Sequence, residues 1–506
     1  MNFADVETVA IIGAGVAGLA TAKALLAQGF SCTVYERSES LGGVWADGYV
    51  GFGVQVQKEL YEFPDFPLPP DAPNFTPGPV FQKYLEDYCD HFGVRQHLRL
   101  GTRVVDVTRD PAAGWALTVE EDGASTTFVA DLVVVATGLY SEKPNIPEIP
   151  GSVRFSGKVL HAYEVKDREA LRGRRVAVIG YGKSATDIAG EAAQSAEVTY
   201  LVFRNAHWPV PRKLAGVLPF KWGMLNRLTA ALIPPYVRPT PLVRWLHGIG
   251  RPLPWIFWRL VEILLRLQFR LDTRIANGRN LVPDQPVEID AFGESTMVPR
   301  PDFIRLIRSG KISAHRTGLA AFTEDGIELE DGSSLKVDTV VFATGWKSGY
   351  SYLSDDVRAA LGGGDDGFYL YRHMLHPDTP GLVFIGRASS FLSVTTYTIQ
   401  AQWLAALLTG RVTPRTADDM RAEISRLKAW KQAWMPIGPA RSARVLLHMA
   451  HYHDELLRDF GADPLRKTGI LKPLKELALP YQSRDYAGIA SGQTNTPGRL
   501  GPGVSH

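Results

Sequence analysis

The chain has 506 residues, a mass of 55.7 kDa and a net charge of only +2. This length exceeds what one hydrophobic core usually serves, so two large domains are expected, and the near-neutral charge argues against nucleic-acid binding. The two cysteines, Cys32 and Cys89, lie far apart, and residues 1–8 lack the chemistry of a signal or transit peptide. We therefore expect no disulfide framework and a cytoplasmic location.

The first predicted unit is a strand, a glycine turn and a helix over residues 9–26. Its turn reads Gly13-Ala-Gly15-Val-Ala-Gly18. In such a turn the first glycine bends the chain, the second lets a pyrophosphate approach, and the third allows close packing of the helix. Glu36 ends the next strand, where a carboxylate can accept hydrogen bonds from ribose hydroxyls. The pattern predicts a dinucleotide-binding unit.

The same order recurs over residues 175–203. An apolar strand leads into a second turn, and a helix and a further strand follow it. The turn residues expected to face a pyrophosphate are Gly180, Gly182, Lys183, Ser184 and Ala185. A second Rossmann-like unit is therefore predicted.

The residue that ends the second strand differs between the two units. Arg204 follows Gly180 by 24 positions, and Glu36 follows Gly13 by 23, so the two occupy equivalent places. A guanidinium can bind a 2′-phosphate in two-point fashion, whereas a carboxylate would repel it. The first unit therefore suits FAD and the second NADPH, with Lys183 and Arg212 adding positive charge.

Several motifs resemble those of flavin-containing monooxygenases and their Baeyer–Villiger relatives. Residues 36–45 resemble the EXXXXXGGXW stretch of these enzymes, and residues 155–161 resemble their FxGxxxH fingerprint. Residues 63–67, Phe-Pro-Asp-Phe-Pro, are similar to a segment that lies against the flavin. The resemblance adds the following cofactor-binding residues: Arg37, Gly43, Val44, Trp45, Thr137, Gly138, Thr344, Gly345 and Gln400.

The resemblance also implies a domain order, because Thr137-Gly138 and Thr344-Gly345 match the turns at which the chain crosses between domains. We expect an α/β protein with two Rossmann-like domains, the NADPH domain being inserted in the FAD domain. The expected boundaries are 1–150 and 336–410 for the FAD domain, 151–335 for the NADPH domain, and 411–506 for a helical C-terminal extension.

The activity implied by the resemblance is FAD- and NADPH-dependent insertion of one oxygen atom from O2 into an apolar small molecule, through a C4a-hydroperoxyflavin. In its protonated form this species oxygenates nitrogen or sulfur, and in its deprotonated form it attacks ketones. Gln55 stands where the family usually has an asparagine beside the reactive flavin, and is the candidate catalytic residue. Val165 stands where the fingerprint usually has an aromatic residue, so Baeyer–Villiger oxidation stays open as an alternative.

Other classes of protein fit less well. A flavin disulfide reductase would need paired redox cysteines, and Cys32 and Cys89 are 57 positions apart. An oxidase without nicotinamide would not need the second glycine loop, and a non-catalytic nucleotide-binding protein stays open. No metal site is expected, and His161 is expected to have a structural role in the linker before the NADPH domain.

An insert at about 205–285 is strongly basic. Between residues 205 and 272, ten lysine and arginine residues face only Glu262 and Asp272, a local charge of +8. Residues 254–271 predict a helix that is apolar almost all round, with its charged residues on one narrow stripe. Such a helix is expected to be buried on most of its surface. Residues 214–271 could form a lid for an apolar substrate, a peripheral membrane contact, or a homodimer or core helix.

Overall fold

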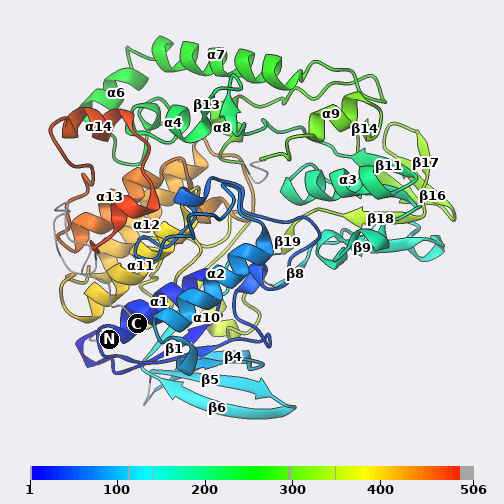
Figure 1. Cartoon of the computed structure of the whole chain (residues 1–506). Helices are drawn as coiled ribbons and strands as arrows, with labels where there is room; N and C mark the ends of the chain where they lie inside the picture. Colours follow the sequence, from blue (N-terminus) through cyan, green and yellow to red (C-terminus); the bar gives the residue numbers. More distant parts are fainter. Residues whose placement is uncertain (1–2, 112–113, 141, 294–297, 348, 490–506) are drawn as a thin grey trace.

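The computed structural model describes residues 3–111, 114–140, 142–293, 298–347 and 349–489 (Figure 1). A five-stranded sheet with all neighbours parallel, in the order β20–β7–β1–β2–β3, contains the N-terminal strand. The strands are β1 (Thr8–Ile12), β2 (Ser31–Tyr35), β3 (Leu98–Arg99), β7 (Leu132–Val135) and β20 (Leu382–Phe384). Its central strands are runs of valine and isoleucine with almost no exposed surface, as both faces of the sheet are covered.

The two faces of this sheet are covered differently. On one face α1 (Val16–Leu26) packs along α11 (Ser393–Leu408), and the many alanines of α1 allow close approach. On the other face lies an antiparallel sheet of β4 (Arg103–Asp110), β5 (Gly114–Glu121) and β6 (Ala124–Ala130). Two helices flank the unit, α2 (Gly78–His91) and α10 (Asp355–Leu361).

A second parallel sheet of five strands has the order β14–β11–β10–β18–β9. Its strands are β9 (Lys158–His161), β10 (Arg175–Ile179), β11 (Val198–Val202), β14 (Ser313–His315) and β18 (Thr339–Phe342). Around it lie α3 (Lys183–Ser195), α9 (Phe303–Arg308), β15 (Leu319–Phe322), β16 (Gly326–Leu329) and β17 (Ser334–Lys336). This is the second Rossmann-like unit that the sequence predicts.

The chain crosses between the two units twice, at adjacent places. After β7 it leaves the first unit through β8 (Lys143–Pro144), which pairs with β19 (Trp346–Lys347) on the return path to β20. The second unit is therefore inserted in the first, and the predicted fold class is confirmed. The domain boundaries at 150, 335 and 410 stay predictions.

The insert forms the upper rim of the molecule in Figure 1. It contains β12 (Lys213–Leu214), β13 (Leu218–Pro219), α4 (Phe220–Met224), α5 (Arg227–Ala230), α6 (Pro241–His247) and α7 (Pro252–Phe269), and α8 (Val287–Asp290) follows it directly. The long helix α7 corresponds to the helix predicted at 254–271.

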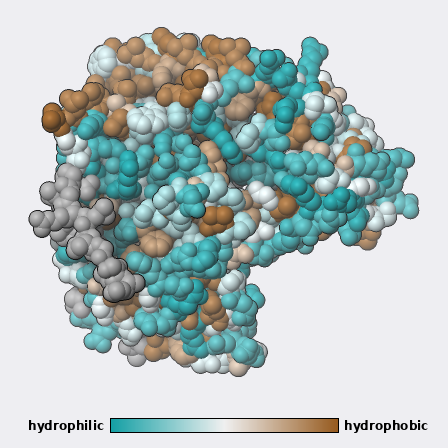
Figure 2. Space-filling view, in the orientation of Figure 1, coloured by the Kyte–Doolittle hydropathy of each residue, from teal (hydrophilic) through white to brown (hydrophobic). Residues whose placement is uncertain are grey.

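The prediction that α7 is buried on most of its surface is wrong. Only Pro254, Trp258 and Leu265 are buried, because the helix has neighbours on one side alone. Its outer face carries large apolar side chains that are 47–70% exposed: Leu253, Ile256, Leu260, Ile263 and Leu267. Figure 2 shows hydrophobic surface gathered along this rim. The polar stripe predicted for this helix partly faces the protein, because the guanidinium of Arg259 forms an ion pair with the carboxylate of Glu288.

The C-terminal extension is helical over its described part, with α12 (Ala417–Gln432), α13 (Met449–Asp459) and α14 (Lys472–Ala478). A short strand pair, β21 (Ser389–Ser390) and β22 (Arg444–Leu446), joins it to the start of α11. Residues 490–506 of the predicted extension lie outside the described residues. Among the helices that the structure describes, none has the length and apolarity needed to cross a membrane.

Candidate active site

The first glycine loop joins β1 to α1 and fits the pyrophosphate of a dinucleotide. A Cβ atom on Gly18 would lie 1.9 Å from the carbonyl oxygen of Gly13, so glycine is needed there for the helix to pack. A Cβ on Gly13, whose φ is +103°, would touch Ala136 at 3.0 Å. At Gly15 the nearest atom would be the Cα of Gly43 at 3.9 Å, which leaves space for a phosphate to approach.

Glu36 is held beside this loop. It is buried, and its carboxylate accepts hydrogen bonds from the backbone N–H groups of Ala14 (2.9 Å) and Ser38 (3.0 Å). These bonds fix the carboxylate at the end of β2, where the ribose of FAD is expected. The neighbouring candidates Arg37 and Val44 are exposed.

Trp45 belongs to an aromatic cluster beside the first loop. Its ring centroid lies 4.5 Å from that of Phe81 and 5.7 Å from that of Tyr61. Burial raises the pKa of Tyr61 far above its usual range, and the nearby hydroxyls of Tyr140 and Tyr397 raise it further. Burial also raises the pKa of Tyr397 to about 12.

The second glycine loop, between β10 and α3, has the same design. A Cβ on Gly180 would lie 2.5 Å from the carbonyl oxygen of Ala343, whereas a Cβ on Gly182 would meet nothing within 4 Å. Ala185 takes the place of the third glycine of the first loop. Its methyl group would lie 3.6 Å from a Cβ on Gly180, which is an ordinary van der Waals distance. The open space at Gly182 is where a pyrophosphate can approach.

Lys183 is not free in this structure. Its Nζ lies 2.6 Å from both carboxylate oxygens of Asp187, one turn further along α3. The hydroxyl of Tyr49, from the FAD-binding unit, donates to the same carboxylate at 2.9 Å and also interacts with Ser184. Burial raises the pKa of Asp187, and Lys183 opposes that shift. The contact ties the two dinucleotide units together beside the second loop.

The two arginines expected at the 2′-phosphate lie at the surface. Arg204 is exposed just beyond the end of β11, the place that Glu36 has in the first unit. Arg212 places its guanidinium 3.9 Å from the ring centroid of Phe75, a residue of the first unit. The exposed guanidinium of Arg204 can therefore bind a phosphate. The guanidinium of Arg212 instead stacks on the ring of Phe75, across the junction between the two units.

The second crossing turn, Thr344-Gly345, is hydrogen-bonded to the segment by which the chain leaves the first unit. Asn145 donates its backbone N–H to Gly345 at 2.9 Å and its side-chain amide to Thr344 at 3.2 Å. His161 is 3% exposed and its Nε2 lies 3.0 Å from the Gly345 carbonyl, and burial lowers its pKa. A neutral, donating imidazole agrees with the structural role predicted for His161. At the other turn, Thr137 lies 3.1 Å from the hydroxyl of Tyr352, and Gly138 has a φ of +73°.

The two predicted glutamines have contrasting positions. Gln400 is fully buried in α11, where its Oε1 accepts from the backbone of Gly386 at 3.3 Å and its Nε2 donates to Tyr452 at 2.8 Å. Its side chain is therefore engaged within the protein. Gln55 is exposed, three residues before the Lys58–Leu60 turn.

The family model described as flavin-binding monooxygenase-like matches residues 6–249 and 297–479. The chain belongs to this family. Among curated relatives, flavin-containing monooxygenase 1 of Homo sapiens is 29% identical over 90% of this chain and 84% of its own. Flavin-containing monooxygenase 3 of Canis lupus familiaris is 28% identical, over 90% and 83%. A probable flavin-containing monooxygenase 1 of Arabidopsis thaliana is also 28% identical, over 94% and 96%.

Solved structures share the fold. Cyclohexanone monooxygenase in an open form gives a TM-score of 0.65 at 19% identity, covering 90% of this chain and 97% of that one. S-allyl-L-cysteine S-oxygenase from Allium sativum gives 0.62 at 21%, covering 92% and 90%. The predictions of family, fold class and flavin-dependent monooxygenase activity are confirmed. The family match omits residues 250–296, which contain α7 and α8.

Sequence reasoning missed several side chains of this flavin-binding monooxygenase-like site. Tyr61 and Tyr397 are more than 300 positions apart, so no local pattern joins them. Tyr49 and Asp187 likewise meet only across the domain junction. The Lys183–Asp187 pair has helical i, i+4 spacing and could have been found from the sequence.

Proposed function

We propose that this flavin-binding monooxygenase binds FAD at the first glycine loop and NADPH at the second, and inserts one oxygen atom of O2 into a nitrogen or sulfur atom of an apolar small molecule. Relatives are named for N-oxide formation and for S-oxygenation, and structural neighbours also include the Baeyer–Villiger-type cyclohexanone monooxygenase. Baeyer–Villiger oxidation of a ketone is therefore the second candidate.

The observation that carries the proposal is the pair of glycine loops, each with open space for a pyrophosphate at its second glycine, Gly15 and Gly182. Tyrosine hydroxyls also lie close to the first loop. Tyr61 and Tyr397 are uncharged at neutral pH, as tyrosines ordinarily are, and burial raises the pKa of each further. Neutral hydroxyls can donate hydrogen bonds but do not withdraw protons. Such a lining can donate hydrogen bonds to a bound oxygen species, and the preference for nitrogen or sulfur follows the relatives named for N-oxide formation.

The flavin supplies the redox chemistry when bound, and the chain's own residues position it and exclude water. Glu36 and the space above Gly15 hold the dinucleotide, while Gly182 leaves space for the nicotinamide cofactor. The Tyr49–Asp187 hydrogen bond joins the two units beside the second glycine loop. Arg204 binds the 2′-phosphate in this assignment.

Gln55 is proposed as the amide that hydrogen-bonds at the reacting edge of the flavin. Its exposure leaves both amide groups available for such a bond. Gln55→Leu should lower the fraction of NADPH oxidation that yields product, whereas Gln55→Asn should retain most of it. Equal loss in both variants would remove this role.

Two measurements test the activity. Under anaerobic conditions NADPH should reduce the bound flavin, and in air the enzyme should convert an aryl methyl sulfide or a tertiary amine to its oxide. No flavin reduction by NADPH would exclude the monooxygenase mechanism. Esters formed from ketones, with no sulfoxide from sulfides, would favour the Baeyer–Villiger alternative.

A peripheral membrane contact is proposed for the outer face of α7, defined by Leu253, Ile256, Leu260, Ile263 and Leu267. These residues are spaced 3, 4, 3 and 4 positions apart and form one exposed apolar stripe. Trp245 and Trp255 beside it are more than half exposed, and tryptophan favours the interface between lipid and water. The cytoplasmic side of a membrane is the proposed location.

Charge favours an anionic lipid surface over a second copy of the chain. Arg244, Arg251 and Arg270 on this rim are exposed, and within the described residues they have no ion pair. A symmetric dimer through the outer face of α7 would bring two such cationic rims together, which costs energy. Phospholipids with negative headgroups would attract them instead.

Co-sedimentation with vesicles tests this contact. The protein should bind phosphatidylcholine vesicles containing about 30% phosphatidylserine more strongly than vesicles without it. Leu260→Asp should reduce the bound fraction several-fold, and Val129→Asp, at an exposed valine of β6, should not. Concentration-dependent dimers that Leu260→Asp abolishes, without vesicle binding, would overturn the membrane proposal.

A further inference from the structure

A cavity lies directly beneath α7, on the side opposite its exposed outer face. It is partly open, and the space between its walls, counted together with the solvent-open part, is about 530 Å³. Its walls come from the segment after β11, the insert, and the starts of α11 and α13. Representative lining residues are Trp208, Met224, Val261, Leu265, Phe391 and Leu447.

Among the described residues that line the cavity, every polar side chain is hydrogen-bonded. Asp290 is the one charged residue among those that line it. Its Oδ1 lies 2.8 Å from Nδ1 of His207 and its Oδ2 accepts the backbone N–H of Trp208 at 2.7 Å. The indole N–H groups of Trp208 and Trp258 donate to backbone carbonyls, each at 2.7 Å. With these atoms satisfied, the cavity suits an uncharged apolar group.

The short helix α4 connects this cavity to the flavin-binding unit. Phe220 and Met224 line the cavity, while Lys221, between them, is 8% exposed and lies 3.4 Å from Glu59. Glu59 belongs to the Lys58–Leu60 turn, four residues after Gln55. The cavity therefore lies close to the segment that we assign to the flavin.

A second connection runs through α11. Phe391, two residues before α11 begins, lines the cavity and lies 5.9 Å from the ring of Phe220. Helix α11 then packs along α1, which begins at the first glycine loop. The cavity thus borders the segment that leads into α11, the helix that packs along α1 of the FAD unit.

We propose that this cavity binds the apolar end of the substrate, so that the enzyme favours molecules in which a nitrogen or sulfur atom carries a long alkyl chain. The inference rests on the proposed function and names the substrate class of that site. Helix α7 supplies the outer wall through Trp258, Val261 and Leu265. The family match omits this helix, so the preference belongs to a segment outside the shared family pattern.

A series of methyl n-alkyl sulfides, from methyl to decyl, tests the proposal. Burial of each additional methylene should raise kcat/KM by about fourfold until the cavity is filled, because apolar area leaves water. Sulfoxide formation is the readout, so that NADPH consumption without oxygen transfer is not counted. Equal kcat/KM for short and long sulfides would overturn the inference while leaving the proposed function intact.

Two variants of α7 extend the test. Val261→Trp fills part of the cavity and should lower kcat/KM for long sulfides at least tenfold while changing that for dimethyl sulfide little. Leu265→Ala enlarges the cavity and should move the preference to longer chains. Val153→Trp makes the same substitution at a valine that is 98% exposed and should change neither value.

The outcomes separate the two proposals. If no sulfide of any length is oxygenated, the proposed function fails. If sulfides are oxygenated but Val261→Trp lowers the rate for all chain lengths equally, the cavity does not select the substrate. If Val261→Trp does not fold, the wild-type series and Leu265→Ala still decide the question.

Discussion

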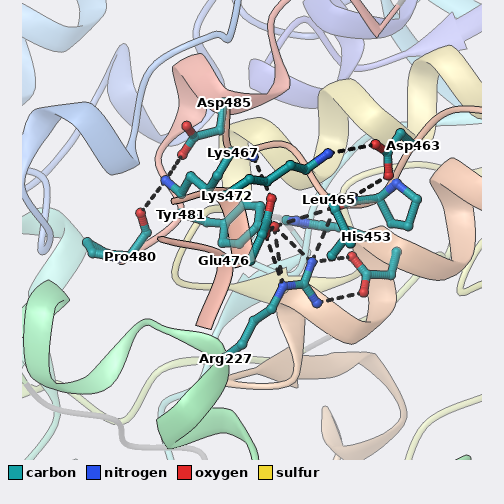
Figure 3. Close-up of polar contacts among 12 residues, drawn as sticks. Arg227, His453, Asp463, Leu465, Lys467, Lys472, Glu476, Pro480, Tyr481 and Asp485 are labelled. Carbon is teal, nitrogen blue, oxygen red and sulfur yellow. Dashed lines mark hydrogen bonds and ion pairs between the residues drawn. The ribbon is translucent and has the colours of Figure 1, made fainter. Parts of the chain in front are cut away.

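Arg227 in the insert and Asp454 in the C-terminal extension form a two-point ion pair, with Nη1–Oδ2 and Nη2–Oδ1 distances of 2.7 and 2.8 Å. The same guanidinium reaches the Tyr481 hydroxyl at 3.0 Å and lies 3.6 Å from Glu476 (Figure 3). Tyr481 also donates a hydrogen bond to Glu476. The pair therefore joins two parts of the chain more than 200 positions apart.

We expect Arg227→Met to lower the free energy of unfolding by about 3–5 kcal/mol, since Asp454 and Glu476 would stay buried without this cation. Denaturant unfolding measures the change. Arg421→Met is the matched control, because Arg421 pairs with Asp378 at the surface and its loss should cost about 1 kcal/mol or less. Equal losses in the two variants would show that burial does not strengthen the Arg227 pair.

A glycine-to-alanine substitution in each glycine loop should impair the binding of a different cofactor. Gly182→Ala adds a methyl into open space, so the protein should fold normally and keep its flavin, while KM for NADPH rises at least tenfold. Gly15→Ala should instead lower the flavin content of the purified protein. Flavin absorbance and NADPH saturation curves measure these effects, and a normal KM in Gly182→Ala would argue against pyrophosphate binding there.

Arg204 should select NADPH over NADH. Arg204→Ala removes a charged hydrogen-bond donor worth about 1.5–3 kcal/mol, so KM for NADPH should rise about tenfold to a hundredfold with little change for NADH. Lys183→Met should have a smaller effect, because Lys183 is already paired with Asp187. Flavin reduction rates at varied cofactor concentration test this, and equal effects on both cofactors would refute the assignment.

Acid should destabilise the protein through buried histidines. Burial lowers the pKa of His453 to about 3, where its nitrogens meet the hydroxyls of Thr396 and Tyr486. An unfolded histidine titrates near about 6.5, so between those values only the unfolded chain binds the proton, and stability falls as pH falls. The unfolding free energy should therefore depend less steeply on pH in His453→Gln than in the wild type. The two slopes should differ by about 1.4 kcal/mol per pH unit below the pKa of the unfolded histidine. Urea unfolding at pH 7, 6 and 5 measures the slope, and an unchanged slope would contradict the pKa shift.

Local features of the chain were readable from the sequence because they depend on near neighbours. The strand, glycine loop and helix order at Gly13 and Gly180 requires only residues within one unit, and both units formed as predicted. The places of Glu36 and Arg204 follow from the same spacing. Helix α7 was also predicted within two residues of its ends.

Sequence by itself thus determined the two dinucleotide units, their order and the family, because glycine geometry and strand patterns are local. Tertiary structure alone decided which side of α7 is covered, since an apolar helix carries no local signal of where its neighbours lie. It also decided that Lys183 is paired and that Gln400 is engaged inside the protein. The tyrosines beside Trp45 and the cavity beneath Val261 come from distant segments, and only folding brings such segments together.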